Sequence, residues 1–142
     1  MNPYLIFILC ALVGEFILSS VTKWLNLKAM NPILPDEFVG FYDEEKYKKS
    51  QEYTIDNTRF GFIASTLNII IILLFILYGG FDVIDHYIRG YNFESDIVLG
   101  VVYFFTLFLM KDIISIPLSI YSTFVIEDKY GFNKTTPKLF VL

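Results

Sequence analysis

The stretch from residue 60 to residue 81 constrains this chain most, because it runs for 22 residues without a charged side chain. About 20 apolar residues in a helix match the hydrocarbon thickness of a bilayer. Gly79 and Gly80, at the end of the stretch, favour termination of such a helix. The sequence therefore predicts a membrane span over 60–81, in which Ser65 and Asn68 are available for hydrogen bonds between helices.

A second apolar stretch covers residues 3–27 and carries a single acid, Glu15, in its centre. Lys23 and Trp24 lie near its end, where interfacial residues are common. The start of the chain has no positive charge, and no small-residue cleavage site follows the apolar run cleanly. A retained anchor is therefore favoured over a signal peptide.

The third apolar stretch, residues 96–126, is longer than one crossing requires. Its 31 residues would extend about 46 Å as a helix, whereas a bilayer core is about 30 Å thick. No turn residue divides it into two arms, so the sequence predicts one long helix, bent at Pro117. The predicted fold class is an all-α integral membrane protein with about three transmembrane helices, treated as one unit over 1–142.

Composition agrees with this class. With 55% hydrophobic and 18% aromatic residues, the chain has more apolar surface than an ordinary soluble domain can bury. The bilayer is therefore an expected partner. The net charge is −4 and the basic residues do not cluster, which argues against a nucleic-acid partner. Cys10 is the only cysteine, so an intrachain disulfide is excluded.

The segments between the spans have different characters. Residues 43–59 predict a helical loop with Asp43 as its cap and with Glu44–Lys48 and Glu45–Lys49 as favourable i,i+4 pairs. Tyr47 and Tyr53 are the residues expected to pack. Residues 82–96 predict a short loop. Its His86 is interpreted as a surface histidine, because zinc sites need several closely spaced ligands.

The charges of the loops predict the orientation of the chain. Residues 28–59 carry five Lys and Arg, residues 82–96 carry one, and the tail after Glu127 carries three. By the positive-inside rule, the first loop and the carboxyl tail lie in the cytoplasm and the amino terminus lies outside.

Besides Lys23 and Asp96 near the ends of the predicted spans, three charges fall deep inside them: Glu15, Lys111 and Asp112. Ionisable groups at this depth face a protein interior or a water-filled cavity. Glu15 is interpreted either as a carboxylate that lines a cavity or handles protons, or as a buried side chain bonded to a Ser, Thr or Lys of a neighbouring helix. The sequence predicts Glu15 as the partner of Lys111.

The end of the third span carries a recognisable pattern. Pro117-x-x-x-Tyr121-x-x-Phe124-x-Ile126-Glu127-x-x-x-Gly131-Phe132-Asn133-x-x-Thr136 resembles the signature of the type I CAAX prenyl proteases. Pro35-x-Glu37 and Tyr47-x-Lys49-Ser50-x-x-Tyr53 give a weaker second match in the family's order. From local chemistry alone, Gly131 is expected to end the helix with positive φ and Asn133 to start the following turn.

The resemblance implies an integral-membrane zinc metalloendopeptidase that cleaves prenylated proteins at their carboxyl end. The chain has one histidine and no H-E-x-x-H, so catalytic residues and zinc ligands are expected in a carboxyl-terminal catalytic part and none in this chain. The resemblance implies that the chain forms walls of a substrate chamber and is inactive alone. Glu127, Gly131, Phe132 and Asn133 are interpreted as a turn that docks a cytosolic domain, with direct substrate contact as the alternative.

Two other functions remain open at this stage. The first is a stand-alone three-span module for interaction or scaffolding. The second is a transporter-like role for Glu15, Lys111 and Asp112. A chain that continues into a further span and H-E-x-x-H favours the protease.

Overall fold

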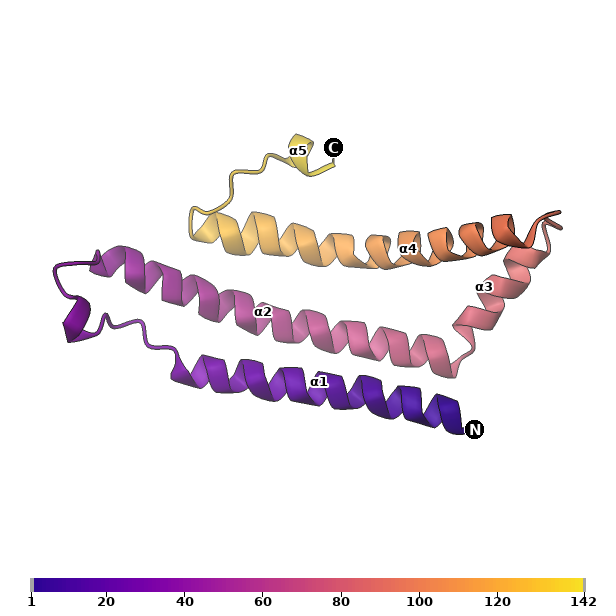
Figure 1. The fold of residues 1–142 in the computed structure, drawn as a ribbon. Coiled ribbons are helices and arrows are strands. Elements are labelled where there is room, and N and C mark those ends of the chain that lie inside the picture. Colours follow the sequence, from indigo (N-terminus) through magenta and orange to yellow (C-terminus); the bar gives the residue numbers. More distant parts are fainter. Residues whose placement is uncertain (1, 142) are drawn as a thin grey trace.

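A computed structural model describes residues 2–141 as three long helices joined by shorter elements (Figure 1). No β-strand occurs in this part of the chain, and the predicted all-α membrane fold is confirmed. The long helices are α1 (Pro3–Ala29), α2 (Glu44–Leu77) and α4 (Asp96–Tyr121), and the last continues as a π-helical segment (Ser122–Glu127). The short ones are a 3-10 turn (Asp36–Phe38), α3 (Gly80–Arg89) and α5 (Pro137–Val141).

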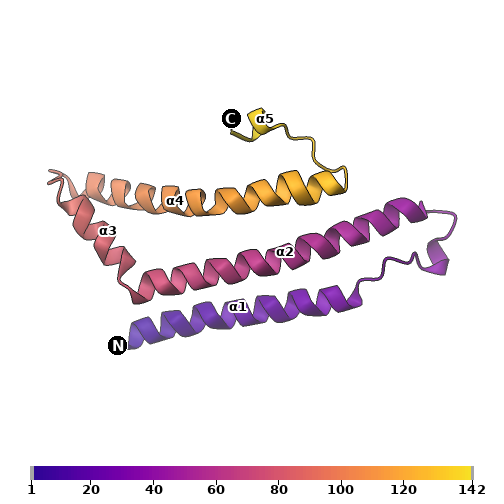
Figure 2. The same cartoon turned by 180° about the vertical axis from the view of Figure 1, so that it is seen from behind.

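The long helices run antiparallel in sequence order, with α2 between α1 and α4 (Figure 1, Figure 2). The start of α1, the whole of α3 and the start of α4 lie at one end of the molecule, called the α3 end below. The connection over residues 30–43 and the turn over residues 128–136 lie at the opposite end, the loop end. The chain therefore crosses from one end to the other three times.

The three long helices expose the apolar surface of membrane spans. They comprise 27, 34 and 32 residues when the π-helical segment is counted with α4, and none of their apolar windows is buried. Leu18 is 69% exposed and Phe104 is 62% exposed. Because a bilayer core is crossed by about 20 residues, each helix is long enough to span it. The chain is a multi-pass membrane protein whose apolar faces are covered by lipid or by other helices.

The first half of α2 is the predicted helical loop, which joins the second span without a break. The Asp43 carboxylate accepts hydrogen bonds from the amides of Glu45 (3.0 Å) and Lys46 (3.2 Å), as expected of a helix cap. These backbone donors lower the pKa of Asp43. The helix ends at Leu77, a few residues before the predicted end of the span.

The predicted pairs Glu44–Lys48 and Glu45–Lys49 do not form among the residues described. Lys46 instead lies 3.5 Å from the Asp43 carboxylate. Exposed pairs of long side chains gain little, because the attraction in water barely exceeds the lost rotamer freedom.

The prediction of a loop over 82–96 is wrong in its first half, which is helix α3. Gly79 adopts φ 70° and separates α2 from α3. Phe81, Ile84 and Ile88 then share one face of α3, where Ile88 is 4% exposed and Phe81 packs edge-on against Phe75 at 4.7 Å. Because acids separate these apolar residues in the sequence, no long apolar run indicates this short amphipathic helix.

The prediction of one long helix over the third apolar stretch is confirmed. Pro117 lies inside α4, where it removes one backbone donor. Five residues after it, the helix widens into the π-helical segment, and the whole run is gently curved in Figure 1. The end of α4 lies against α2, where the ring of Tyr121 stacks on that of Phe60.

Candidate functional site

The turn that follows the third span is built by local hydrogen bonds. The Glu127 carbonyl accepts the amide of Phe132 (2.9 Å) and that of Asn133 (3.3 Å). Gly131 adopts φ 66°, the left-handed conformation that closes such a helix end. The Asn133 side chain then accepts the amide of Thr135 at 2.7 Å, which starts the next turn as the sequence predicts.

The remaining residues of the pattern connect this turn to its neighbours. Tyr121 stacks on Phe60 of α2 at 4.9 Å, and Phe124 lies 5.4 Å from the ring of Phe140 in α5. The Thr136 carbonyl accepts the amides of residues 139 and 140, so Thr136 begins the short helix α5. The pattern therefore joins α2, α4 and α5 at the loop end.

The two segments that resemble the protease family meet in space. The ring of Tyr53 lies 4.9 Å from the ring of Phe132, and the Lys49 ammonium is 5.6 Å from the centre of that ring. Lys49 also approaches Gly131, since a Cβ added there would lie 3.5 Å from its Nζ. The expectation that Tyr53 packs is thereby met. Segments some 80 residues apart form one contact surface at the loop end.

A polar cluster, which the sequence analysis missed, fastens this surface. The Asp56 carboxylate accepts hydrogen bonds from Lys129 Nζ (2.6 Å) and from the Tyr130 hydroxyl (2.7 Å). Tyr130 is 6% exposed, and its ring lies 5.7 Å from Tyr53. The only sequence signal was an acid one turn before the second span and a Lys-Tyr pair after the third. Lys129 and Tyr130 follow Asp56 by 73 and 74 residues, so no short-range spacing indicates this contact.

In this cluster Lys129 and Tyr130 lose their protons at a higher pH than usual. The bond to Asp56 raises the pKa of Lys129 to about 12, and burial followed by the bond to Asp56 raises the pKa of Tyr130 above 10.0. Both values are higher than in the unfolded chain, so the associated stability is complete below about pH 10 and is lost as pH rises through the folded pKa values.

We expect the difference in absorbance at 295 nm between the protein and its Tyr130→Phe variant to titrate with a midpoint above pH 10.0. A midpoint at or below that pH would show that Tyr130 lacks this environment.

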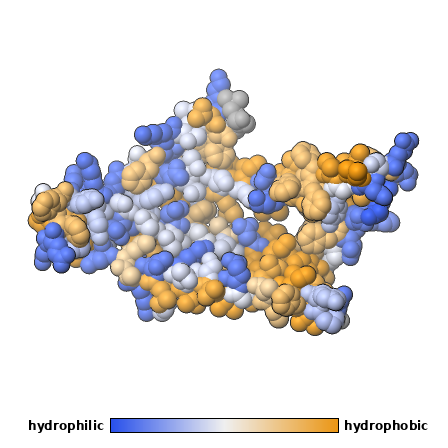
Figure 3. Space-filling view, viewed as in Figure 1, coloured by the Kyte–Doolittle hydropathy of each residue, from blue (hydrophilic) through white to orange (hydrophobic). Residues whose placement is uncertain are grey.

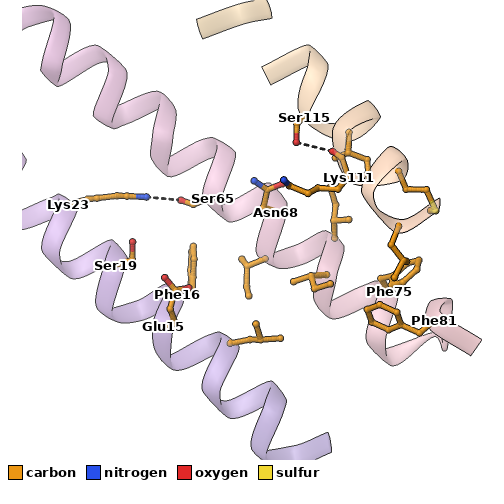
Figure 4. Close-up of a pocket in the computed structure, with 17 residues that line it drawn as sticks. Glu15, Phe16, Ser19, Lys23, Ser65, Asn68, Phe75, Phe81, Lys111 and Ser115 are labelled. Atoms are coloured by element: carbon orange, nitrogen blue, oxygen red, sulfur yellow. Dashed lines mark hydrogen bonds between the residues drawn. The ribbon is translucent and has the colours of Figure 1, made fainter. Parts of the chain in front are cut away.

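A cavity of about 600 Å³ opens between the three spans. Glu15 and Lys23 of α1, Asn68 of α2 and Lys111 of α4 line it, together with serines and apolar side chains (Figure 4). Lys23 donates to the Ser65 hydroxyl across α1 and α2 at 3.5 Å. The interpretation of Glu15 as a carboxylate that lines a cavity agrees with this placement.

The predicted ion pair between Glu15 and Lys111 is absent from the residues described. Because α2 lies between α1 and α4, Lys111 meets α2 first and extends toward Asn68 (Figure 4). Asp112 is not among the residues that line the cavity. The next residue of a helix lies about 100° around its axis, so Asp112 is carried away from the face of Lys111.

Comparison with known proteins identifies the family. The family model described as "CAAX prenyl protease N-terminal, five membrane helices" matches residues 23–142. The chain belongs to this CAAX prenyl protease family. It is 37% identical to "Probable CAAX prenyl protease 1" of Schizosaccharomyces pombe over 112 residues, which are 70% of this chain and 24% of that protein. It is 30% identical to "CAAX prenyl protease 1 homolog" of Oryza sativa, over 98% of this chain and 34% of that protein.

The fold is shared with a solved CAAX prenyl protease family structure. The crystal structure of S. mikatae Ste24p matches 99% of this chain with a TM-score of 0.84 and 27% sequence identity, and the match covers 34% of the Ste24p chain. The chain therefore spans about a quarter to a third of the length of the relatives it matches.

The residues described do not fit the zinc ion that the family implies. Within 2–141, no three His, Cys, Asp or Glu side chains are placed to hold a metal ion. The cluster around His86 is unsuitable, because the Asp85 carboxylate is engaged by Arg89 at 2.7 Å. Catalytic zinc takes about three protein ligands, so no catalytic step is assigned to these residues.

Proposed function

We propose that this chain is the membrane part of a zinc metalloendopeptidase that cleaves prenylated proteins or related membrane peptides near their carboxyl end. The observation that carries the proposal is the meeting of the two family segments, Lys49–Tyr53 and Gly131–Phe132, in one contact surface. The shared fold with Ste24p over 99% of the chain supports it. By itself the chain is expected to be inactive, with the zinc ligands and the general base in a catalytic part outside these 142 residues.

The same proposal gives each region a role. The cavity between the spans is part of the chamber that receives the prenylated substrate, with Glu15 and Lys111 in its wall. The turn at Glu127–Asn133 docks the catalytic part. The loop end lies in the cytoplasm and the amino terminus outside, since the loop-end segments carry most of the Lys and Arg. Asp112, outside the cavity, is expected to face another helix rather than lipid.

The native protein, extracted from its source membranes, tests this function. We expect stoichiometric zinc and cleavage of a farnesylated peptide that ends in a CAAX sequence, with no cleavage after zinc is removed by chelation. The same peptide without the farnesyl group is the control and should be cleaved poorly. A native species of 16.5 kDa without zinc or peptidase activity would favour the stand-alone membrane module.

A further inference from the structure

Two lysines reach the same level of the cavity from opposite flanks of α2. Lys23 of α1 donates to Ser65, and Lys111 of α4 extends toward Asn68 (Figure 4). Ser65 and Asn68 are three residues apart, which is a rise of about 4.5 Å along the helix. These four residues are called the two-lysine site below.

Neither lysine has a carboxylate partner among the residues described, because no ion pair within 4.0 Å involves Lys23 or Lys111. Glu15, the acid of the cavity, precedes Lys23 by eight residues, or about 12 Å along α1. Lys111 lies at membrane depth, where an ammonium group is costly unless it is hydrated or paired with an anion. The two-lysine site therefore attracts a negatively charged group.

Most of the apolar lining lies to one side of this site, although Ile114 and Ser115 follow Lys111 on the other side and Glu15 lies toward the α3 end on α1. Ile69, Ile72 and Phe75 follow Asn68 along α2, whereas Leu107 and Met110 precede Lys111 along α4. Because α2 and α4 run antiparallel, both groups lie toward the α3 end. Figure 3 shows hydrophobic residues gathered toward that end on the face of the molecule that is viewed in Figure 1. The cavity thus joins a positively charged level to a largely apolar end, where Glu15 is the one acid of the lining.

We propose that the cavity binds a single-chain amphiphile with a carboxylate head, held between Lys23 and Lys111, and with its aliphatic chain directed toward α3. A volume of about 600 Å³ lies within the range of about 300–1,000 Å³ that is usual for small-ligand sites. A membrane fatty acid and the free carboxyl end of a prenylated peptide share this chemistry. Assignment to the peptide rests on the proposed function, whereas the binding site itself does not.

The test uses cis-parinaric acid, whose fluorescence rises on binding, with the native protein in neutral detergent and protein-free micelles as the blank. A chelator is present, so that the result does not depend on zinc or on peptidase activity. Its methyl ester, which has the same chain without the charge, is the matched ligand. We expect the acid to bind at least about tenfold more tightly than the ester, since hydrogen bonds to charged groups are stronger than those between neutral groups.

Variants locate the head group. Lys23→Met and Lys111→Met should each weaken binding of the acid about tenfold and leave binding of the ester unchanged. Lys111→Arg keeps the charge and should keep the affinity. Lys46→Met, at an exposed position of the loop end, is the control and should change neither. Equal affinities for acid and ester, or an unchanged affinity in Lys111→Met, would overturn the proposal.

Competition identifies the natural source of the carboxylate. A farnesylated peptide with a free carboxyl end should displace parinaric acid, and the same peptide with a carboxyl-terminal amide should not. If neither peptide competes while acid and ester still differ, the site is supported as a fatty-acid site and its link to the protease substrate fails. If the native protein binds parinaric acid as expected but has no peptidase activity, the result counts against the proposed function alone.

Discussion

Replacement of Asp56 by alanine is expected to lower the free energy of unfolding by about 2–3 kcal/mol. Asp56 is the acceptor of both the Lys129 ammonium and the Tyr130 hydroxyl. Since Tyr130 is 6% exposed, the alanine variant leaves a buried hydroxyl without this acceptor, and bonds to charged groups contribute about 1.5–3 kcal/mol. Unfolding of the purified protein by SDS in mixed micelles measures the change.

Two further variants separate the bond from other effects. Tyr130→Phe removes the hydroxyl together with its need for a partner, so it should cost about 1 kcal/mol or less. Glu52→Ala lies one turn before Asp56 on α2, and Glu52 takes no part in the ion pairs of the residues described. It should change stability by less than about 0.5 kcal/mol. An Asp56→Ala variant as stable as Glu52→Ala would show that the cluster does not fasten the loop end.

Features set by composition and local chemistry were predictable from the sequence. The three spans follow from the length of their apolar runs, which is fixed by the thickness of the bilayer. The helix end at Gly131 and the turn at Asn133 follow from the backbone preferences of glycine and asparagine. The cap at Asp43 follows from the need of the first amides for acceptors.

Features that depend on the order of the helices in space were not predictable in this way. Lys111 seemed matched to Glu15 because both are charges at mid-span, but α2 separates their helices. The partnership of Asp56 with Lys129 and Tyr130 links distant segments that no spacing rule connects. Helix α3 was missed for another reason, since its apolar face covers only about two turns between acids.

The junction of α2 and α3 is the other place where one substitution should have a large effect. Gly80 begins α3 directly against the ring of Phe75, and a Cβ added at Gly80 would lie 2.7 Å from the ring Cγ and nearer still to two other ring carbons. Phe75 has little room to retreat, because Phe81 packs edge-on against it at 4.7 Å. The close approach of Gly80 therefore sets how α3 leaves α2.

Gly80→Ala is expected to lower the free energy of unfolding by about 1–3 kcal/mol, the usual cost of overpacking. Gly61→Ala is the matched control, because Gly61 lies in α2, the helix that carries Phe75, with nothing within 4 Å of its added Cβ. That change should be neutral or stabilising by up to about 1 kcal/mol.

Phe75→Leu combined with Gly80→Ala should cost less than the sum of the two single changes, since the smaller side chain removes the clash. SDS unfolding of the three single variants and the double variant measures these differences. If the costs of Phe75→Leu and Gly80→Ala are additive, the effect of Gly80→Ala does not arise from its contact with Phe75. If the contact holds, Gly80 also sets the apolar end of the cavity, because α3 contributes Phe81 to its lining.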